Sequence, residues 1–436
     1  MINPSKTILL LILVIFISAT GLTQRLGLQD AVSIALKNSL NIRLGKNYVE
    51  IASINNHYGI AGGLPVVTAT GNDNEQTINI RQQYSNPANN KNASNVSSNN
   101  FSAGLAAGVL LSNGQRVVNT KKRLGIVEDQ SKEQLDSRIQ LVVAGVMLKY
   151  YDILRQQSYA FTLENSIEVS KQKLDIVKTQ QSVGMANDAD LFQAEVDLNT
   201  QIQTLGSQQL VVDQDKMDLL TLLNLPADSV VIIADTILVD KNIRLDTILN
   251  NLPSNPDLIA ADRQVDINRF IEKEIAAERY PSLNLNAGYN FSRNQNAAGF
   301  TLLNQNYGPY ASLGLFIPIF NGGIYRRQQQ IAGINIKNAQ MQKDTLLLNY
   351  RANIFKNWQA YLSSLQLLEK AQENYVLSQK LLDLVLKRFK LRQATIVEVK
   401  NAQQSFENSG YILINISYAA KAAEIQLKRY ANKLEY

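Results

Sequence analysis

The sequence predicts an α+β membrane protein built from two internal repeats. The expected assembly is a trimeric 12-stranded β-barrel, with four strands from each chain, continued by a long α-helical barrel. Three observations favour it: motifs that return at nearly constant offsets, segments that alternate like transmembrane strands, and two long helical stretches without proline. A compact globule of 436 residues needs no helices of that length, so strands bracketed by them point toward a membrane.

The chain carries the same pattern twice. Gly104 returns as Gly314, an offset of 210, and Asp190 returns as Glu398, an offset of 208. Offsets this constant over such a distance indicate a duplicated unit. Each copy is expected to run helix, strand, polar loop, strand, very long helix, tight turn, helix. The expected divisions are a signal peptide (1–24), a first repeat (25–225), a linker or equatorial segment (226–246) and a second repeat (247–436).

The N-terminus has the layout of a signal peptide. Lys6 precedes an apolar run over residues 8–17, which is too short to span a bilayer comfortably as a helix. Cleavage is expected between Ala19 and Gln24, and a retained anchor is the alternative. No later stretch approaches the roughly 20 apolar residues of a transmembrane helix, so membrane-spanning segments would have to be strands.

Composition excludes several classes of function. The chain has no cysteine and one histidine, His57, which excludes thiol catalysis, zinc fingers, iron–sulfur clusters and disulfides. No nucleophile–base or metal-ligand set stands out, so we expect neither an enzyme nor a cofactor. The net charge of +6 is modest, and no basic stripe alternates with aromatic residues, so we expect no nucleic acid partner. The absence of cysteine fits a secreted bacterial protein.

Alternation with a period of two marks the strands. It runs over residues 101–111 in the first copy and over 282–291 and 307–318 in the second, and it is weak over 66–72. One face is apolar, and the other carries serine, asparagine and glycine. The apolar positions are Phe101, Ala103, Leu105, Ala107, Val109, Leu111, Leu283, Leu285, Ala287, Tyr289, Phe291, Ala311, Leu313, Leu315 and Ile317.

Strands of about 10 residues cross a bilayer when tilted. A soluble half-buried sheet would alternate in the same way, but the Asn-, Ser- and Gly-rich face and the polar loops over 86–100 and 292–296 favour a membrane barrel. Four strands cannot close a barrel, because about eight is the smallest number that can. Two chains would give a barrel filled by side chains, whereas three would enclose a pore, so a pore predicts a homotrimer.

Two long helices are expected after the turns at 112–114 and 321–323. The stretches over 115–183 and 324–391 contain no proline, and about 68 residues at 1.5 Å each extend roughly 100 Å. A coiled-coil fibre or a soluble bundle is the alternative from the helices alone. With the strands attached, two hairpins from each of three chains would form a cylinder of about 12 helices. The segment 225–245 is expected to form a belt around them, with a β-rich run from Val230 to Ile233.

Three motifs resemble the TolC-type outer-membrane efflux family, the outer membrane factors. They are the start of each copy, Leu28-Gln29-Asp30-Ala31 and Asn255-Pro256-Asp257-Leu258; the run from Phe316 to Gly323; and the hairpin tips, Val183-Gly184-Met185-Ala186 with Asp190, and Thr395-Ile396-Val397-Glu398-Val399. In this order and spacing they cover nearly the whole mature chain. The corresponding barrel-to-helix turns hold Asn113, Gly114, Pro318, Asn321, Gly322 and Gly323.

The resemblance implies an outer-membrane channel-tunnel of a Gram-negative cell, with its barrel in outer-membrane lipid and its helices in the periplasm. Such a duct is passive and serves efflux or type I secretion. It works with an inner-membrane pump of the RND or ABC type through a periplasmic adaptor, the membrane fusion protein. The alternative from another class is a trimeric surface fibre or adhesin with a barrel anchor.

The resemblance also assigns a periplasmic gate. Glu398 lies where the first gate acid of the family falls, and Asn401 lies where a second acid is often found. Three such carboxylates around an axis would raise each other's pKa and attract cations. The alternative for Glu398 is a solvated helix face with a salt bridge to Arg392 or Lys400.

The hairpin tips are implied to dock the adaptor. The residues concerned are Gly184, Met185, Asp190, Arg392 and Thr395. Arg392 replaces the usual glycine of the second tip, and Asp188 is expected to cap the helix that follows Gly184.

Basic residues follow the strands closely in both copies and are expected either to meet anionic lipid headgroups or simply to be solvated. They are Lys121, Lys122, Arg123, Arg326 and Arg327.

Overall fold

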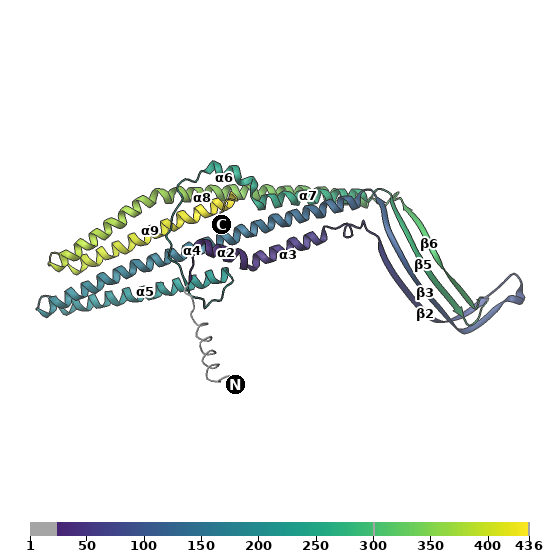
Figure 1. Ribbon diagram of the computed structural model, residues 1–436, viewed down its shortest axis with the longest axis horizontal. Coiled ribbons are helices and arrows are strands. Elements are labelled where there is room, and N and C mark those ends of the chain that lie inside the picture. The colour runs from purple at the N-terminus through teal and green to yellow at the C-terminus, as the bar shows by residue number, and fades with distance from the viewer. Residues whose placement is uncertain (1–23, 300, 435–436) are drawn as a thin grey trace, which may run out of the picture. The chain divides into compact units, whose positions relative to one another are not determined.

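The structure is a computed structural model that describes residues 24–299 and 301–434 (Figure 1). The predicted signal peptide therefore lies outside the described residues, apart from Gln24. In chain order the elements are β1 (Gln24–Arg25), α2 (Leu28–Asn38), α3 (Leu40–Asn55), β2 (Val66–Gln82), η1 (Pro87–Asn89), β3 (Lys91–Asn113), α4 (Arg116–Ser182), α5 (Asp188–Leu222), β4 (Val231–Ile232), α6 (Leu245–Asn251), η2 (Leu252–Ser254), α7 (Pro256–Ala277), β5 (Ser282–Asn296), β6 (Leu303–Phe316), α8 (Ile324–Lys390) and α9 (Ile396–Tyr430). Among the described helices, none is both long enough and apolar enough to cross a membrane.

The predicted duplication is confirmed by the helices. α4 and α8 each have 67 residues, and α5 and α9 each have 35. α4 begins at Arg116 and α8 at Ile324, an offset of 208. α5 ends at Leu222 and α9 at Tyr430, which is the same offset. The contacts divide the chain into two compact units, and each unit takes segments from both copies. Unit 1 is Met1–Asn47, Glu133–Ile259 and Thr345–Tyr436, and unit 2 is Tyr48–Lys132 and Ala260–Asp344.

Unit 2 contains one antiparallel sheet with the order β2-β3-β5-β6. Its register confirms the predicted faces over the middle of the strands, because apolar positions pair across three strands: Val109 lies opposite Leu285, which lies opposite Leu313. The prediction is wrong at two strand ends: a register shift between Leu110 and Ser112 places Ser112, and not Leu111, opposite Leu283, and β6 ends before Ile317. On the other face Gly108 lies opposite Asn286. A Cβ atom at Gly108 would lie 2.8 Å from the Asn286 side-chain oxygen, so glycine leaves the space that the asparagine occupies.

The strands are longer than the predicted length of about 10 residues. β2, β3, β5 and β6 have 17, 23, 15 and 14 residues, and the expected polar loops over 86–100 and 292–296 are largely strand. The β2–β3 ladder continues past the end of β5, as Figure 1 shows. Polar side chains do not interrupt the ladder, because its hydrogen bonds belong to the backbone. They also pair across it: Asn99 donates to Asp73 at 2.7 Å, and Ser97 donates to Glu75 at 2.6 Å.

Unit 1 is helical, with the α4–α5 and α8–α9 hairpins packed through three apolar clusters. The predicted β-rich run over 230–233 forms only the two-residue strand β4, which pairs in parallel with β1. Beside it, the buried Tyr150 hydroxyl donates to the carbonyl of Leu26 at 2.9 Å and to the carboxylate of Asp235. Burial first, and then this carboxylate, raises the pKa of Tyr150, so its hydroxyl stays a neutral donor.

Candidate functional site

The tip of the first hairpin closes on Gly184. The Gly184 N–H donates to the carbonyl of Gln181, and the Met185 N–H donates to the carbonyl of Gln180, both at 2.8 Å. This is the pattern of a Schellman motif. This closure requires a positive φ, and Gly184 has φ 72°. The exposed side chain of Met185 follows it directly.

The tip of the second hairpin closes in the same way on an arginine. Arg392 has φ 63°. Its N–H donates to the carbonyl of Phe389 at 3.0 Å, and the N–H of Gln393 donates to the carbonyl of Arg388 at 2.8 Å. The Arg388 guanidinium also donates to the Gln393 carbonyl at 2.6 Å. The Arg392 guanidinium contacts the sulfur of Met185, so two of the predicted docking residues meet across the tips.

Glu398 is part of a capping box at the start of α9. Its carboxylate accepts from the N–H of Thr395 at 2.6 Å, and its own N–H donates to the Thr395 hydroxyl at 3.2 Å. The bond from the Thr395 N–H lowers the pKa of the exposed Glu398 carboxyl most strongly, and the Thr395 hydroxyl lowers it further. The salt bridge with Arg392 or Lys400 that belonged to the alternative for Glu398 is not formed, because the cap holds the carboxylate and Lys400 instead pairs with Asp197 at 2.9 Å. The Thr-x-x-Glu spacing was visible in the sequence.

The prediction that Asp188 caps the helix after the first tip is wrong. The cap of α5 is Asn187, whose side chain accepts from the N–H of Asp190 at 2.8 Å. Asp188 lies one residue too late to cap, and it accepts from Gln181 at 2.7 Å instead. Asn401 is exposed on α9, about one turn beyond Glu398.

The barrel-to-helix turns lie in unit 2. The Asn113 side chain accepts from the N–H of Val117 at 3.3 Å, which caps α4. Gly114 has φ 65°, and a Cβ atom there would lie 2.6 Å from that of Tyr280, so no larger residue fits. In the second copy Pro318 and Asn321 follow β6, and Gly322 and Gly323 have φ 67° and 76°.

A buried polar network joins the first hairpin to α9 and has no counterpart among the sequence predictions. Lys173 on α4 is 0% exposed and pairs with Asp197 on α5 at 2.7 Å, and the other oxygen of Asp197 pairs with Lys400 on α9. Burial acts to raise the pKa of Asp197, but the two lysines outweigh it and hold the pKa below its ordinary value. Charged residues at helical spacing usually indicate a solvated face, so nothing in the sequence marks these as partners.

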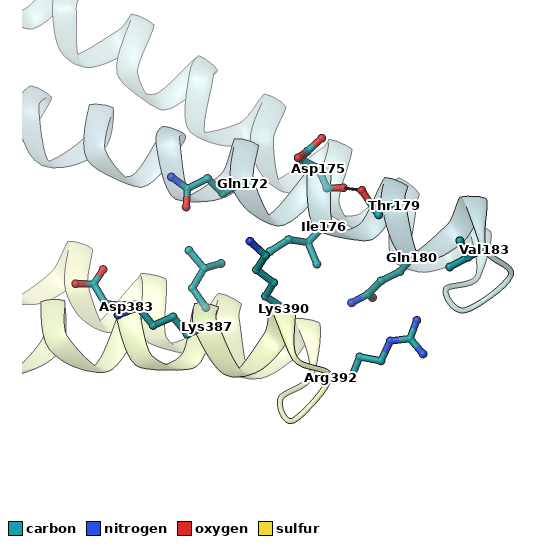
Figure 2. A pocket seen from close by; sticks show the side chains of 11 residues that line it. Gln172, Asp175, Ile176, Thr179, Gln180, Val183, Asp383, Lys387, Lys390 and Arg392 are labelled. Atoms are coloured by element: carbon teal, nitrogen blue, oxygen red, sulfur yellow. Dashed lines mark hydrogen bonds between the residues drawn. The ribbon is translucent and has the colours of Figure 1, made fainter.

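A groove of about 780 Å³ lies beside the tips, between the ends of α4 and α8 (Figure 2). Lys390 extends from α8 toward α4 beside Ile176, and Arg392 lies at the mouth of the groove. The basic run from Lys387 to Arg392 is visible in the sequence, but only the fold shows that it borders α4. The lining residues are Gln172, Asp175, Ile176, Thr179, Gln180, Val183, Asp383, Leu386, Lys387, Lys390 and Arg392.

These features are polar contacts, helix caps and an open groove. In the part of the chain that the structure describes, no group of three or more His, Cys, Asp or Glu residues is placed to hold a metal ion. The residues predicted for the gate and for docking, in contrast, gather at one place. Glu398, Thr395, Arg392 and Met185 all belong to the paired tips of the two hairpins.

The chain matches the family model described as outer membrane efflux protein, over residues 31–225 and 248–433. Among curated proteins, no sequence matches significantly. The fold is similar to solved outer-membrane channels at low sequence identity. The CmeC channel of Campylobacter jejuni superposes with a TM-score of 0.77 at 16% identity, over 93% of this chain and 85% of that one. VceC of Vibrio cholerae gives 0.75 at 15% identity, over 93% and 95%. The open state of MtrE from Neisseria gonorrhoeae gives 0.67 at 17% identity, over 93% and 88%.

Proposed function

Since the chain belongs to the outer membrane efflux protein family, we propose that three copies form a passive exit duct in the outer membrane of a Gram-negative cell. The observation that carries the proposal is the open sheet, in which β2 and β6 are unpaired edges, joined to helices of 67 residues. In lipid, each unpaired backbone group costs several kcal/mol, so the edges must be completed by sister chains. Three copies supply 12 strands and enclose a pore.

The apolar face of the sheet meets lipid in this assembly, and the face with Gly108 and Asn286 meets the water of the pore. The helices continue the pore into the periplasm. A duct of this kind has no energy source of its own, so an inner-membrane pump of the RND or ABC type drives the cargo. Both efflux of small molecules and type I secretion of proteins use the same path.

An adaptor links the pump to the paired tips. The exposed side chains of Met185 and Arg392 contact each other there, and the groove beside them is lined by Lys387 and Lys390. An elongated helical partner fits a groove between two helix ends, and the excess of cations favours acidic residues on that partner.

The gate lies at Glu398 and Asn401. In one chain Glu398 caps α9, and in a trimer three such carboxylates would face a common axis and repel one another. The same side chain then has two roles, which substitution can separate. Glutamine at 398 keeps an oxygen acceptor for the N–H of Thr395 but removes the charge, whereas alanine removes both.

Planar-bilayer recordings of the purified protein test this assignment. We expect Glu398→Gln to keep the closed state but lose cation preference and cation block, whereas Glu398→Ala also raises the leak current because the first turn of α9 loosens. Asp190→Gln, at the matching position of the first tip, is the control and should behave like the wild type. Identical currents from all four proteins would disprove the gate, and the absence of any large conductance would disprove the duct and favour a barrel-anchored fibre.

A further inference from the structure

A groove of about 540 Å³ in unit 2 lies between α7 and α8, at the end of the helices next to the sheet. Its two arginines are Arg279, three residues before β5 begins, and Arg326, ten residues after β6 ends. Neither side chain has an ion pair or hydrogen bond to a residue in the described part of the chain. The lining residues are Glu272, Arg279, Arg326, Gln329, Gln330, Gly333 and Ile336.

The groove also contains one carboxylate. Oε1 of Glu272 on α7 accepts from Gln329 on α8 at 2.5 Å, which fixes its position. Within residues 24–299 and 301–434, Oε2 has no hydrogen-bond partner. Gly333 leaves open space on the α8 side, since no atom lies within 4 Å of the position that a Cβ would take. The groove therefore contains two arginine guanidinium groups, one carboxylate oxygen without a partner among the described residues and open space beside Gly333.

Large exposed apolar side chains border the same end of the sheet. Phe316 pairs with Ser282 in the register, and Tyr280 immediately follows Arg279. Beyond Phe316, the side chains of Ile319 and Phe320 are 94% and 86% exposed. Aromatic residues with arginines directly beyond them are typical of the boundary between hydrocarbon and headgroups.

We propose that this groove binds the headgroup of a membrane phospholipid with a primary ammonium group, of the phosphatidylethanolamine type. This inference rests on the proposed insertion of the sheet into a bilayer. The phosphate accepts from Arg279 and Arg326, because guanidinium forks match phosphate oxygens in geometry and charge. The ammonium donates to Oε2 of Glu272, and the acyl chains lie against Phe316, Ile319 and Phe320.

The headgroup is chosen by the charges that line the groove. Two arginines and one glutamate match a phosphate with an attached cation better than a phosphate alone. A primary ammonium has three N–H donors for the glutamate, whereas the quaternary ammonium of phosphatidylcholine has none. A headgroup without a cation, such as that of phosphatidylglycerol, would leave the Glu272 oxygen unpaired in a groove closed by lipid, which is unfavourable.

Native mass spectrometry of the detergent-solubilised full-length protein tests the site, with dioleoyl phosphatidylethanolamine, phosphatidylcholine or phosphatidylglycerol added at equal concentration. We expect about one ethanolamine lipid retained per chain. The double substitution Arg279→Gln/Arg326→Gln should lower its affinity about tenfold or more, since it removes the charge-assisted hydrogen bonds to the phosphate. The double substitution Arg351→Gln/Lys356→Gln removes the same charge elsewhere on α8 and should change nothing.

Two further variants sharpen the test. Gly333→Leu fills the groove without changing charge and should also remove the lipid, while Glu272→Gln should erase the preference for ethanolamine over choline. Equal retention of the three lipids by the wild type, retention unchanged in the arginine and leucine variants, or displacement by millimolar inorganic phosphate would each overturn the proposal. The conductance of the same preparations reports on the duct separately, so a failed lipid site and a failed channel give different results.

Discussion

Gly184 and Arg392 occupy the same place in the two copies, and both adopt a left-handed backbone conformation, with φ 72° and 63°. The repeated hairpin imposes this conformation, because the last carbonyls of α4 and α8 are satisfied only if the chain reverses there. Glycine adopts it without strain, whereas a residue with a Cβ atom costs roughly 1–2 kcal/mol. The Arg388 guanidinium, bonded to the carbonyl of Gln393, offsets part of that cost in the second tip.

The first prediction concerns Gly184 itself. Gly184→Ala should destabilise the first tip by about 1 kcal/mol, because no atom lies within 4 Å of the new methyl group and only the backbone is strained. Hydrogen exchange of the tip amides measures this. Gly206→Ala, in the open interior of α5, is the matched control and should slow exchange locally, since alanine favours helix by about 1 kcal/mol. Equal effects at both sites would contradict the assigned turn.

At the scale of the elements, the α4–α5 hairpin is joined to α9 by polar groups as well as by apolar packing. Val177, Ala194 and Phe406 share a buried cluster, and the chain of Lys173, Asp197 and Lys400 runs beside it. Breaking such a pair leaves a buried charge without a partner, whereas an apolar replacement of both partners is often tolerated. The network therefore fixes how the elements align more than it adds net stability.

Asp197→Ala should destabilise the packing of the hairpin by about 3 kcal/mol or more, because it leaves the fully buried Lys173 unpaired. The double variant Lys173→Met/Asp197→Ala should recover much of that loss. Thermal unfolding and hydrogen exchange of α5 report both. A double variant as unstable as the single one would show that the buried lysine is not the cause.

The same network predicts a dependence on pH. The pKa of Asp197 is lower in the folded chain than in the unfolded one, so its contribution to stability is present above the unfolded value of about 3.9 and is lost as the pH falls below it. Hydrogen exchange of α5 should therefore quicken, beyond its intrinsic dependence on pH, below about pH 4 in the wild type. This extra change should be absent in Lys173→Met/Asp197→Ala, and its persistence there would assign it to other groups.

For the whole molecule, the decisive feature is that the sheet does not close on itself. β2 and β6 are its edges, and the long β2–β3 hairpin makes the edge of β2 longer than that of β6. Exposed edges of this length pair with other chains wherever they can. In the proposed assembly, β6 of one copy pairs with β2 of the next, so no strand edge is left unpaired.

Because the chain has no cysteine, this pairing can be tested by cross-linking. Thr70→Cys on β2 with Ser312→Cys on β6 should give a covalent trimer on denaturing gels when treated with a bismaleimide of about 10 Å, since neighbouring strands lie about 5 Å apart. Ala107→Cys with Ala287→Cys, which face each other within one chain, should give a monomer. Dimers without trimers, or monomers throughout, would contradict the assembly.

The sequence alone determined the duplication, the alternating faces of the strands and the limits of the long helices, because these follow from offsets and periods along the chain. It also contained the capping box at Thr395 and Glu398. Only the tertiary structure decided the extent of the strands, the burial of Lys173 and the choice of Asn187 over Asp188 as a cap. Each of these depends on which backbone or side-chain groups meet in space, and residues far apart in the chain, such as Lys173 and Lys400, leave no local pattern that shows their proximity.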